Sequence, residues 1–591
     1  MRKLLVFLLL FGAGLGWLLW RQQQNTKPEA PPEPVVEETR PFTEVGMGVD
    51  PKGRQQAVGV LLDGPLEFVE RATINGRTVR ALDLQASDVD SLDGGRYLLK
   101  DLQIGIHDVE ADAPRAQLKA PRATVTLSTD SGSPQLNRTV PVELEGVIAT
   151  LLRGAPIVPL RVESPRIEWT PGEERYTSNE AVLLSGKGLK ASGLGLDAHP
   201  TKGTIALTRA ASLTLDLEAG GAVTLSSGAE EGIDLRRLER VDGAYLELTA
   251  KGGARLVVTG ARPTSMDSRT ITLLGRLGSD EQPFQLVSVV ADGTTVAEHQ
   301  SDVFRADRAE FFFRANNTLE RAELLGTVVL ESRGDQLRSE IADFRFAADG
   351  TLDKAVLTGS PRGLVNIARL STETPERVEL EGLGPLTLTR GATADLLLGG
   401  PATLTLTSTG VVLRAKDLVE GHVAADGSRG SLLAKGDVVM TRGGEELQSE
   451  DIELLYATTT APAERLRFIS RGRTSLSGRT PQGELVVARA QGGLQGTVGE
   501  QNLRVSTARE VRMELGQPPT LVAQARLLRA FDAAARTLEA SGDVLVESPQ
   551  GVGTADELSV RGPEEVELRG TPGRPARWQT KLAGSAKPDS S

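Results

Sequence analysis

Cysteine is absent from this chain of 591 residues, which excludes disulfides, thiolate metal sites and a cysteine nucleophile. Aromatic residues make up only 4% of the chain, and its 67 basic residues are outnumbered by 79 acidic ones, for a net charge of −12. Because the basic residues are interspersed with acids, no basic face is available to neutralise a phosphate backbone. Nucleic-acid binding is therefore not expected.

Histidine is also scarce, and each of the four stands alone in a turn-like or polar context: His107, His199, His299 and His422. We expect surface or partly satisfied side chains there rather than metal ligands or acid–base groups. Asp88, Asp90 and Asp93 resemble a calcium loop, but their spacing and the missing distal glutamate do not fit an EF-hand, so a polar turn is expected. The chain also lacks a phosphate-binding loop, a dinucleotide motif and a nucleophile elbow. The sequence thus predicts no enzyme activity, no cofactor and no metal site.

Glycine and proline are abundant, with 64 and 31 residues, on a background of Thr, Val, Leu and Ala. Apolar residues alternate with polar ones in many short runs, such as Leu213 to Leu217 and Ala402 to Leu406. This period of two is typical of strands with one apolar and one polar face, so an all-β protein is predicted. The best candidate for a helix is 521–538, although its Arg and Ala content leaves even that segment ambiguous.

The N-terminus carries an uncharged run from Leu4 to Trp20, which includes Trp17 and is flanked by Arg2, Lys3 and Arg21. No small-residue cleavage site follows it, so we expect an uncleaved single-pass anchor rather than a signal peptide. Residues 1–21 would thus comprise a short cytoplasmic N-terminus and the transmembrane anchor. The charge bias predicts that the N-terminus stays in the cytoplasm and that the body lies on the other side of the membrane. Residues 22–41 are polar and proline-rich and should form a linker.

Three segments of the second half repeat a Gly-x-Val pattern, with glycines at Gly326, Gly436 and Gly542. Ser339 and Ser449 follow the first two glycines by thirteen residues, and Thr554 follows the third by twelve. A shared internal spacing of this kind indicates a repeated structural unit that stacks on its neighbours.

These repeats resemble the OstA-like, or LptA-like, repeat of the lipopolysaccharide bridge proteins. Residues 176–207 resemble the periplasmic domain of the anchored transport protein LptC, because an alternating run at Val182 and Leu184 leads through glycine-spaced turns to Asp197 and a further strand. The resemblance divides the body into an LptC-like domain at 42–290, best matched at 160–210, OstA-like repeats at 291–578, and a disordered tail at 579–591. The second repeat departs from the pattern, because residues 464–471 lack its closing glycine.

The resemblance implies elongated, open jelly-roll (β-taco) modules stacked into one trough behind a single transmembrane helix. It implies an inner-membrane protein with its body in the periplasm, which takes lipopolysaccharide from the membrane subunits of an ABC transporter and carries its acyl chains along the trough. LptA-like or outer-membrane LptD-like jelly rolls are the implied partners, joined by pairing of exposed strand edges.

The alternation within the matching segments predicts which side chains would line such a groove. The expected lining residues are Val182, Leu184, Leu189, Leu196, Val328, Leu330, Leu337, Ile341, Phe344, Phe346, Val438, Leu447, Ile452 and Leu454.

Two other functions remain open on the sequence. A closed β-solenoid could serve as an envelope scaffold or adhesin, with the same residues filling a sealed core. A trough could also carry phospholipid, since an aliphatic groove does not specify the acyl chain.

Overall fold

The computed structural model describes residues 64–580, except for the short segments listed next. They are 75–76, 109–112, 129–134, 218–219, 260–262, 279–283, 300–301, 333, 369–375, 391–392, 425–428, 458–465, 480–482, 499–502, 533–536 and 562–564. The predicted anchor with Leu4, Trp17 and Trp20, the linker 22–41 and the tail beyond residue 580 lie outside the described residues; Gln579 and Thr580 of the expected tail belong to the last strand. Within the described part, no helix has the length and apolar character needed to cross a membrane.

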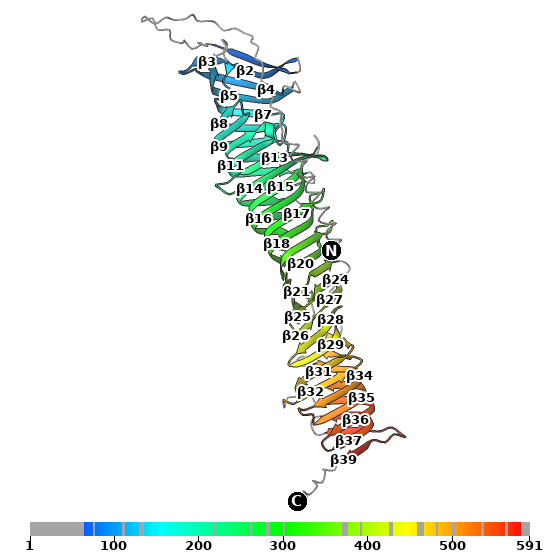
Figure 1. Cartoon of the computed structure of the whole chain (residues 1–591). Coiled ribbons are helices and arrows are strands. Elements are labelled where there is room, and N and C mark those ends of the chain that lie inside the picture. Colours follow the sequence, from blue (N-terminus) through cyan, green and yellow to red (C-terminus); the bar gives the residue numbers. More distant parts are fainter. Residues whose placement is uncertain are drawn as a thin grey trace, which may run out of the picture. The chain divides into compact units, whose positions relative to one another are not determined.

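The described chain is all-β, as predicted, and is built from antiparallel strands (Figure 1). It divides into two compact units, one reaching Lys187 and including Gly195–Ile205, the other comprising Gly188–Leu194 and the chain from Ala206 onward. Residues 290 and 291, between which a boundary was expected, both lie within strand β16, which pairs with β15 on one side and with β17 on the other. The sole helical element of the described residues is a 3₁₀ turn, Pro200–Lys202.

The first unit holds a run of antiparallel strands in which β2, β4, β5, β7, β8 and β9 pair in that order, with β1 on β2 and β3 on β4. Their bounds are β1 Leu66–Ile74, β2 Arg77–Ala86, β3 Asp88–Ser91, β4 Arg96–Asp108, β5 Ala113–Ser128, β6 Gln135–Leu136, β7 Val142–Leu151, β8 Leu160–Thr170 and β9 Arg175–Gly186. Strands β10 Leu189–His199 and β11 Thr204–Asp216 contribute residues to both units.

The second unit continues the antiparallel order to the end of the described chain. Its strands are β12 Ala222–Ser226, β13 Ile233–Arg240, β14 Gly243–Val258, β15 Thr264–Arg276, β16 Gln285–His299, β17 Asp302–Phe313, β18 Leu319–Ser332, β19 Asp335–Phe346, β20 Leu352–Thr358, β21 Arg362–Ala368, β22 Glu376–Gly382, β23 Leu386–Arg390, β24 Thr393–Gly399, β25 Ala402–Leu406, β26 Val411–Ala415, β27 Leu418–Ala424, β28 Arg429–Arg442, β29 Glu445–Ala457, β30 Leu466–Arg471, β31 Thr474–Arg479, β32 Leu485–Ala490, β33 Leu494–Val498, β34 Leu503–Leu515, β35 Leu521–Asp532, β36 Thr537–Ser548, β37 Gly551–Arg561, β38 Glu565–Arg569 and β39 Arg577–Thr580. Residues 521–532, part of the best helix candidate, are thus a strand, because pairing with β34 and β36 overrides a weak helical preference.

Long strands of the second unit bend in the middle, and the bends lie beside one another in successive strands. In β18 the pairing with β19 breaks between Leu325 and Val328, and comparable breaks interrupt the pairing of β14, β15, β16, β17, β28 and β36. Extra residues of this kind are β-bulges, which bend a strand sharply. Figure 1 shows β14 to β18 as successive rungs of this arrangement.

The line of bends divides the second unit into two half-sheets. Half-sheet A contains the first part of β14 and β18 and the second part of β19, and continues through β20, β23, β24 and β27 to the first part of β28. Half-sheet B contains the remaining parts of those strands and continues through β21, β22, β25 and β26. Each half-sheet turns its apolar side chains toward the other, and hairpin turns line the side opposite the bends, which we call the mouth.

The bends explain the repeated Gly-x-Val pattern. Gly326 and Gly436 have φ angles of +92° and +83°, and a Cβ at Gly326 would lie 2.1 Å from a carboxylate oxygen of Asp307. Asp307 also accepts a hydrogen bond from the backbone N–H of Thr327, at 3.0 Å. Only glycine combines this backbone angle with so close a neighbour.

The spacing that the repeats share is also explained by the structure. Val328 lies opposite Ser339, and Val438 lies opposite Ser449. Each thirteen-residue interval therefore runs from the glycine of a bend to a serine beside that bend on the neighbouring strand. In the third segment Val544 lies opposite Ala555, and Thr554 lies one position away opposite Leu545. The repeat predicted from the sequence is therefore a bent strand and its hairpin partner.

Candidate functional site: the apolar interior

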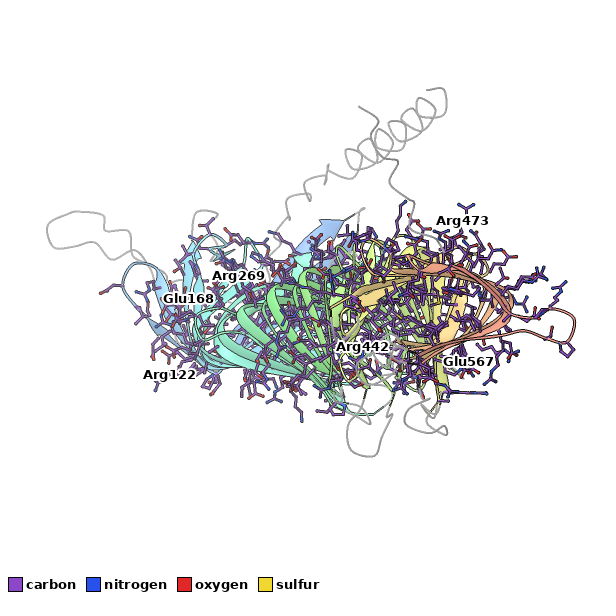
Figure 2. All side chains as sticks on the ribbon, turned by 90° about the horizontal axis from the view of Figure 1, so that it is seen from below. Arg122, Glu168, Arg269, Arg442, Arg473 and Glu567 are labelled. Atoms are coloured by element: carbon purple, nitrogen blue, oxygen red, sulfur yellow. The ribbon has the colours of Figure 1, made fainter. Side chains whose placement is uncertain are left out.

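The interior between the two half-sheets is the candidate site, because it gathers the apolar face of nearly every described strand of the second unit. Its side chains are mainly Leu, Val and Ala, whereas the exposed positions between them carry charged residues in many cross-strand ion pairs, such as Arg321 with Asp343 at 2.9 Å. Figure 2 shows Arg473, in the turn between β30 and β31, at the outer surface of this unit, where its side chain is exposed. The interior offers apolar contact and almost no polar chemistry.

The residues expected to line a groove are buried on the inward side of their strands, with one exception. Val182 and Leu184 in the first unit are buried, as are Val328, Leu330, Leu337, Phe344, Phe346, Val438, Leu447, Ile452, Leu454, Leu189 and Leu196. Burial places them where a lining or a core would be, and it does not distinguish these two roles.

Ile341 is the exception, since its side chain is 47% exposed and lies on the outer surface. The bend beside it inserts one residue into the alternation of β19, so Leu337 points inward before the bend and Ala342, Phe344 and Phe346 point inward after it. A shift of one residue moves every following side chain to the other face. Counting by two across the bend therefore placed Ile341 wrongly.

Aromatic rings from both half-sheets meet in one part of the interior. Phe304 of half-sheet B and Phe344 of half-sheet A have ring centroids 5.3 Å apart at an interplanar angle of 67°. His299 of half-sheet B lies 5.9 Å from Phe346 of half-sheet A, also edge to face. We call His299, Phe304, Phe344 and Phe346 the ring cluster. Of the two settings expected for the histidines, His299 is not at the surface but is partly satisfied, because its side chain is 5% exposed and its Nδ1 lies 2.8 Å from Oγ1 of Thr264.

A buried carboxyl group spans the mouth elsewhere in the second unit. Glu445 begins β29 in half-sheet B, and one of its carboxyl oxygens accepts a hydrogen bond from the backbone N–H of Leu503, which begins β34 in half-sheet A. Glu445 is only 6% exposed, and this burial raises its pKa to about 7, an effect to which the nearby Asp532 carboxylate adds. No local sequence pattern predicts this contact, since the two residues are 58 positions apart in the chain.

Among the described residues, backbone also crosses the mouth where β11 ends. Leu217, directly after β11, forms an isolated bridge with Phe284, directly before β16. Among the described residues no continuous ladder of strand pairing joins the two half-sheets along the mouth. Side chains and isolated contacts close that side.

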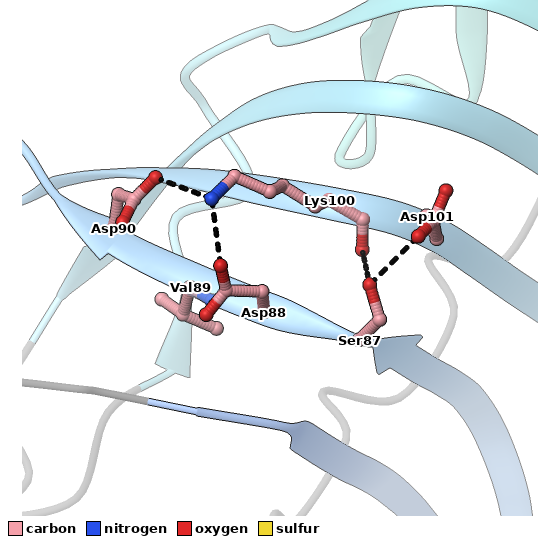
Figure 3. Close-up of polar contacts among 6 residues, drawn as sticks. All are labelled: Ser87, Asp88, Val89, Asp90, Lys100 and Asp101. Atoms are coloured by element: carbon pink, nitrogen blue, oxygen red, sulfur yellow. Dashed lines mark hydrogen bonds and ion pairs between the residues drawn. The ribbon is translucent and has the colours of Figure 1, made fainter.

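The polar clusters singled out in the sequence are ion pairs and hydrogen bonds of the surface. The ammonium group of Lys100 on β4 lies 2.6 Å from Asp88 and 3.0 Å from Asp90 on β3, so it occupies the space between these carboxylates (Figure 3). The hydrogen bond from Lys100 lowers the pKa of Asp88. Ser87 donates to the carboxylate of Asp101 at 2.8 Å. Asp88 and Asp90 therefore belong to a strand, and only the following residues form the expected turn.

The other histidines have acidic neighbours. His107 lies 2.8 Å from Asp83, His422 lies 2.8 Å from Asp395, and His199 lies 3.6 Å from Asp197. Within the part of the chain that the structure describes, no group of three or more His, Cys, Asp or Glu side chains has the geometry of a metal site. Asp437, Arg473 and Arg489 line a pocket of this part together with apolar residues such as Val439 and Ala490.

No protein-family model matches the chain, and a search of curated proteins finds none that is significantly similar to it.

Proposed function

We propose that this chain is an inner-membrane-anchored periplasmic carrier that receives lipopolysaccharide from an ABC transporter and passes its acyl chains along the interior toward the outer membrane. The proposal treats the bent strands as open jelly-roll modules that form one trough. It includes LptA-like or LptD-like jelly rolls as partners, paired with the outer strands of the sheet.

The observation that carries the proposal is the unequal closure of the two sides of the interior. Strands run continuously through many of the bends, whereas side chains and isolated contacts close the mouth. Parting the half-sheets at the mouth would sacrifice apolar contacts and few hydrogen bonds. An acyl chain inserted between them would restore the lost burial at about 25 cal/mol per Å² of apolar surface.

A sealed scaffold is the second candidate, and the packing of the interior favours it. Phe344, Leu447 and Val438 have no exposed surface, and rings of both half-sheets are in contact. A stable scaffold requires such a core, whereas a carrier must be able to open it.

Lipid analysis of the purified full chain decides between these functions. The chain is expressed in cells that make lipopolysaccharide, and the protein is examined by native mass spectrometry and lipid extraction. Copurifying lipopolysaccharide in a fixed ratio supports the proposal, phospholipid alone supports a phospholipid carrier, and a stable lipid-free protein supports the scaffold.

A further inference from the structure

The ring cluster joins the two half-sheets through aromatic side chains that contact one another. Phe304 and Phe344 are 2% and 0% exposed, and Phe304 also lies 6.5 Å from Phe346 at an angle of 69°. One half-sheet thus supplies Phe304 and His299, and the other supplies Phe344 and Phe346. The rings meet edge to face, an arrangement that fixes their relative orientation.

The rings also fill the interior from its middle to the mouth. Along β19, Ala342 lies next to the bend, Phe344 follows in the middle and Phe346 ends the strand at the turn. Along β17, Ala306 lies near the bend and Phe304 lies closer to the mouth, where His299 ends β16. Small alanines lie at the bend and rings lie nearer the mouth, and the aliphatic side chains of Leu330 and Leu337 are on the strands beside Phe304.

The chain that follows contains no phenylalanine, tyrosine or tryptophan from 347 to 455. Its interior is built from aliphatic side chains such as Leu357, Leu398 and Leu404, all without exposed surface. Flexible aliphatic side chains repack around an acyl chain by changing rotamers. A planar aromatic ring has no internal flexibility, so a ring that contacts other rings can make room only by moving as a whole.

We propose that the ring cluster is a constriction which acyl chains must displace, so that it sets the rate at which lipid passes from the interior around β14–β16 to the aliphatic interior around β22–β27. This inference rests on the proposed function and adds to it the residues that limit passage. Phe304 and Phe344 hold the constriction closed, and His299 with Phe346 extends it to the mouth.

The test follows a lipid probe along the full chain. Purified protein is incubated with vesicles that contain a lipid A whose acyl chain carries a diazirine, and samples are irradiated at successive times. Mass spectrometry then maps adducts to residues 243–299 and to residues 376–424. We expect early adducts in the first range and delayed adducts in the second.

Replacing both central rings, Phe304→Leu with Phe344→Leu, should shorten that delay several-fold. Phe311→Leu is the matched control, because Phe311 is a buried ring of the same strand as Phe304 but lies outside the ring cluster, and it should leave the delay unchanged. If circular dichroism shows that the double variant is unfolded, His299→Ala replaces it, with the same expected direction.

An unchanged delay in folded variants, or simultaneous adducts in both ranges of the unaltered protein, would overturn the constriction while leaving the carrier function intact. Absence of adducts in both ranges for every variant contradicts the carrier function itself, and the constriction with it.

Discussion

A carboxyl group in an apolar interior makes stability depend on pH, and Glu445 is the residue of the second unit where this dependence should be largest. Its pKa is raised to about 7 from an ordinary value of 4.5, because burial disfavours the charged form. Below pH 4.5 the group is protonated in both the folded and the unfolded chain, so it does not make the free energy of unfolding depend on pH. Between pH 4.5 and 7 only the unfolded chain loses the proton, so the free energy of unfolding falls as the pH rises.

The variant Glu445→Gln should remove this loss while keeping a hydrogen-bond acceptor for Leu503. We expect it to be more stable than the unaltered protein at pH 8, by up to about 3 kcal/mol, and nearly equal to it at pH 4. Urea unfolding at the two pH values measures the difference. Glu446→Gln, one position away and outside the interior, is the control; an equal effect of both substitutions would show that Glu445 has no special role.

Glycines at the bends and glycines in turns should respond differently to alanine. Gly436 has φ +83°, and a Cβ there would lie 2.3 Å from the carboxylate of Asp417, whereas Gly444 has φ +92° with open space around it. Gly444→Ala should cost about 1 kcal/mol of unfolding free energy from backbone strain alone. Gly436→Ala should cost at least about 1 kcal/mol more, because Asp417 must also move. Equal losses in urea unfolding would mean that the bend tolerates a side chain.

Charge in the interior tests the role of the predicted lining residues. Under the proposed function, Leu184→Asp or Phe344→Asp should abolish lipid binding while the far-ultraviolet circular dichroism stays that of a folded chain, because an opening groove can hydrate the new carboxylate. A sealed core cannot hydrate it, and an unpaired buried charge costs several kcal/mol. Loss of the folded signal in these variants would therefore favour the scaffold.

At the scale of elements, the last described strands offer the edge that the proposed partners need. β38 and β39 pair with the two parts of β37, and Val566 and Trp578 are each 45% exposed. Exposed, uncharged positions on an edge strand favour pairing with another sheet, and lysine on an edge opposes it. Val566→Lys with Trp578→Lys should weaken capture of an LptA-like jelly roll in a pull-down at least tenfold, about 1.4 kcal/mol. Val241→Lys, on the turn between β13 and β14, should leave it unchanged; an undiminished capture by the double variant would exclude this edge.

If the molecule is a carrier, its interior must open at the mouth. Because the chain has no cysteine, introduced cysteines can be crosslinked specifically to test this opening. A bifunctional maleimide joining Glu445→Cys to Leu503→Cys would tie half-sheet B to half-sheet A. We expect it to block the uptake of lipid from vesicles. The matched pair Gln448→Cys and Ser475→Cys lies on neighbouring strands of half-sheet B, and its crosslink should have no effect. Uptake that survives the first crosslink would show that passage does not require opening there.

The sequence by itself determined the strand class, the inward and outward faces and the repeated unit, because all three follow from local alternation and from glycine spacing within one strand and its hairpin partner. Val328, Leu447 and Leu454 could be assigned to the inward face for this reason. Only the tertiary structure decided what depends on register and on distant pairing. The bulge of β19 turned Ile341 outward, and residues 521–532 became a strand between two neighbours. The Glu445–Leu503 contact and the ring cluster join half-sheets whose residues approach only after the strands bend, so no local pattern could predict them.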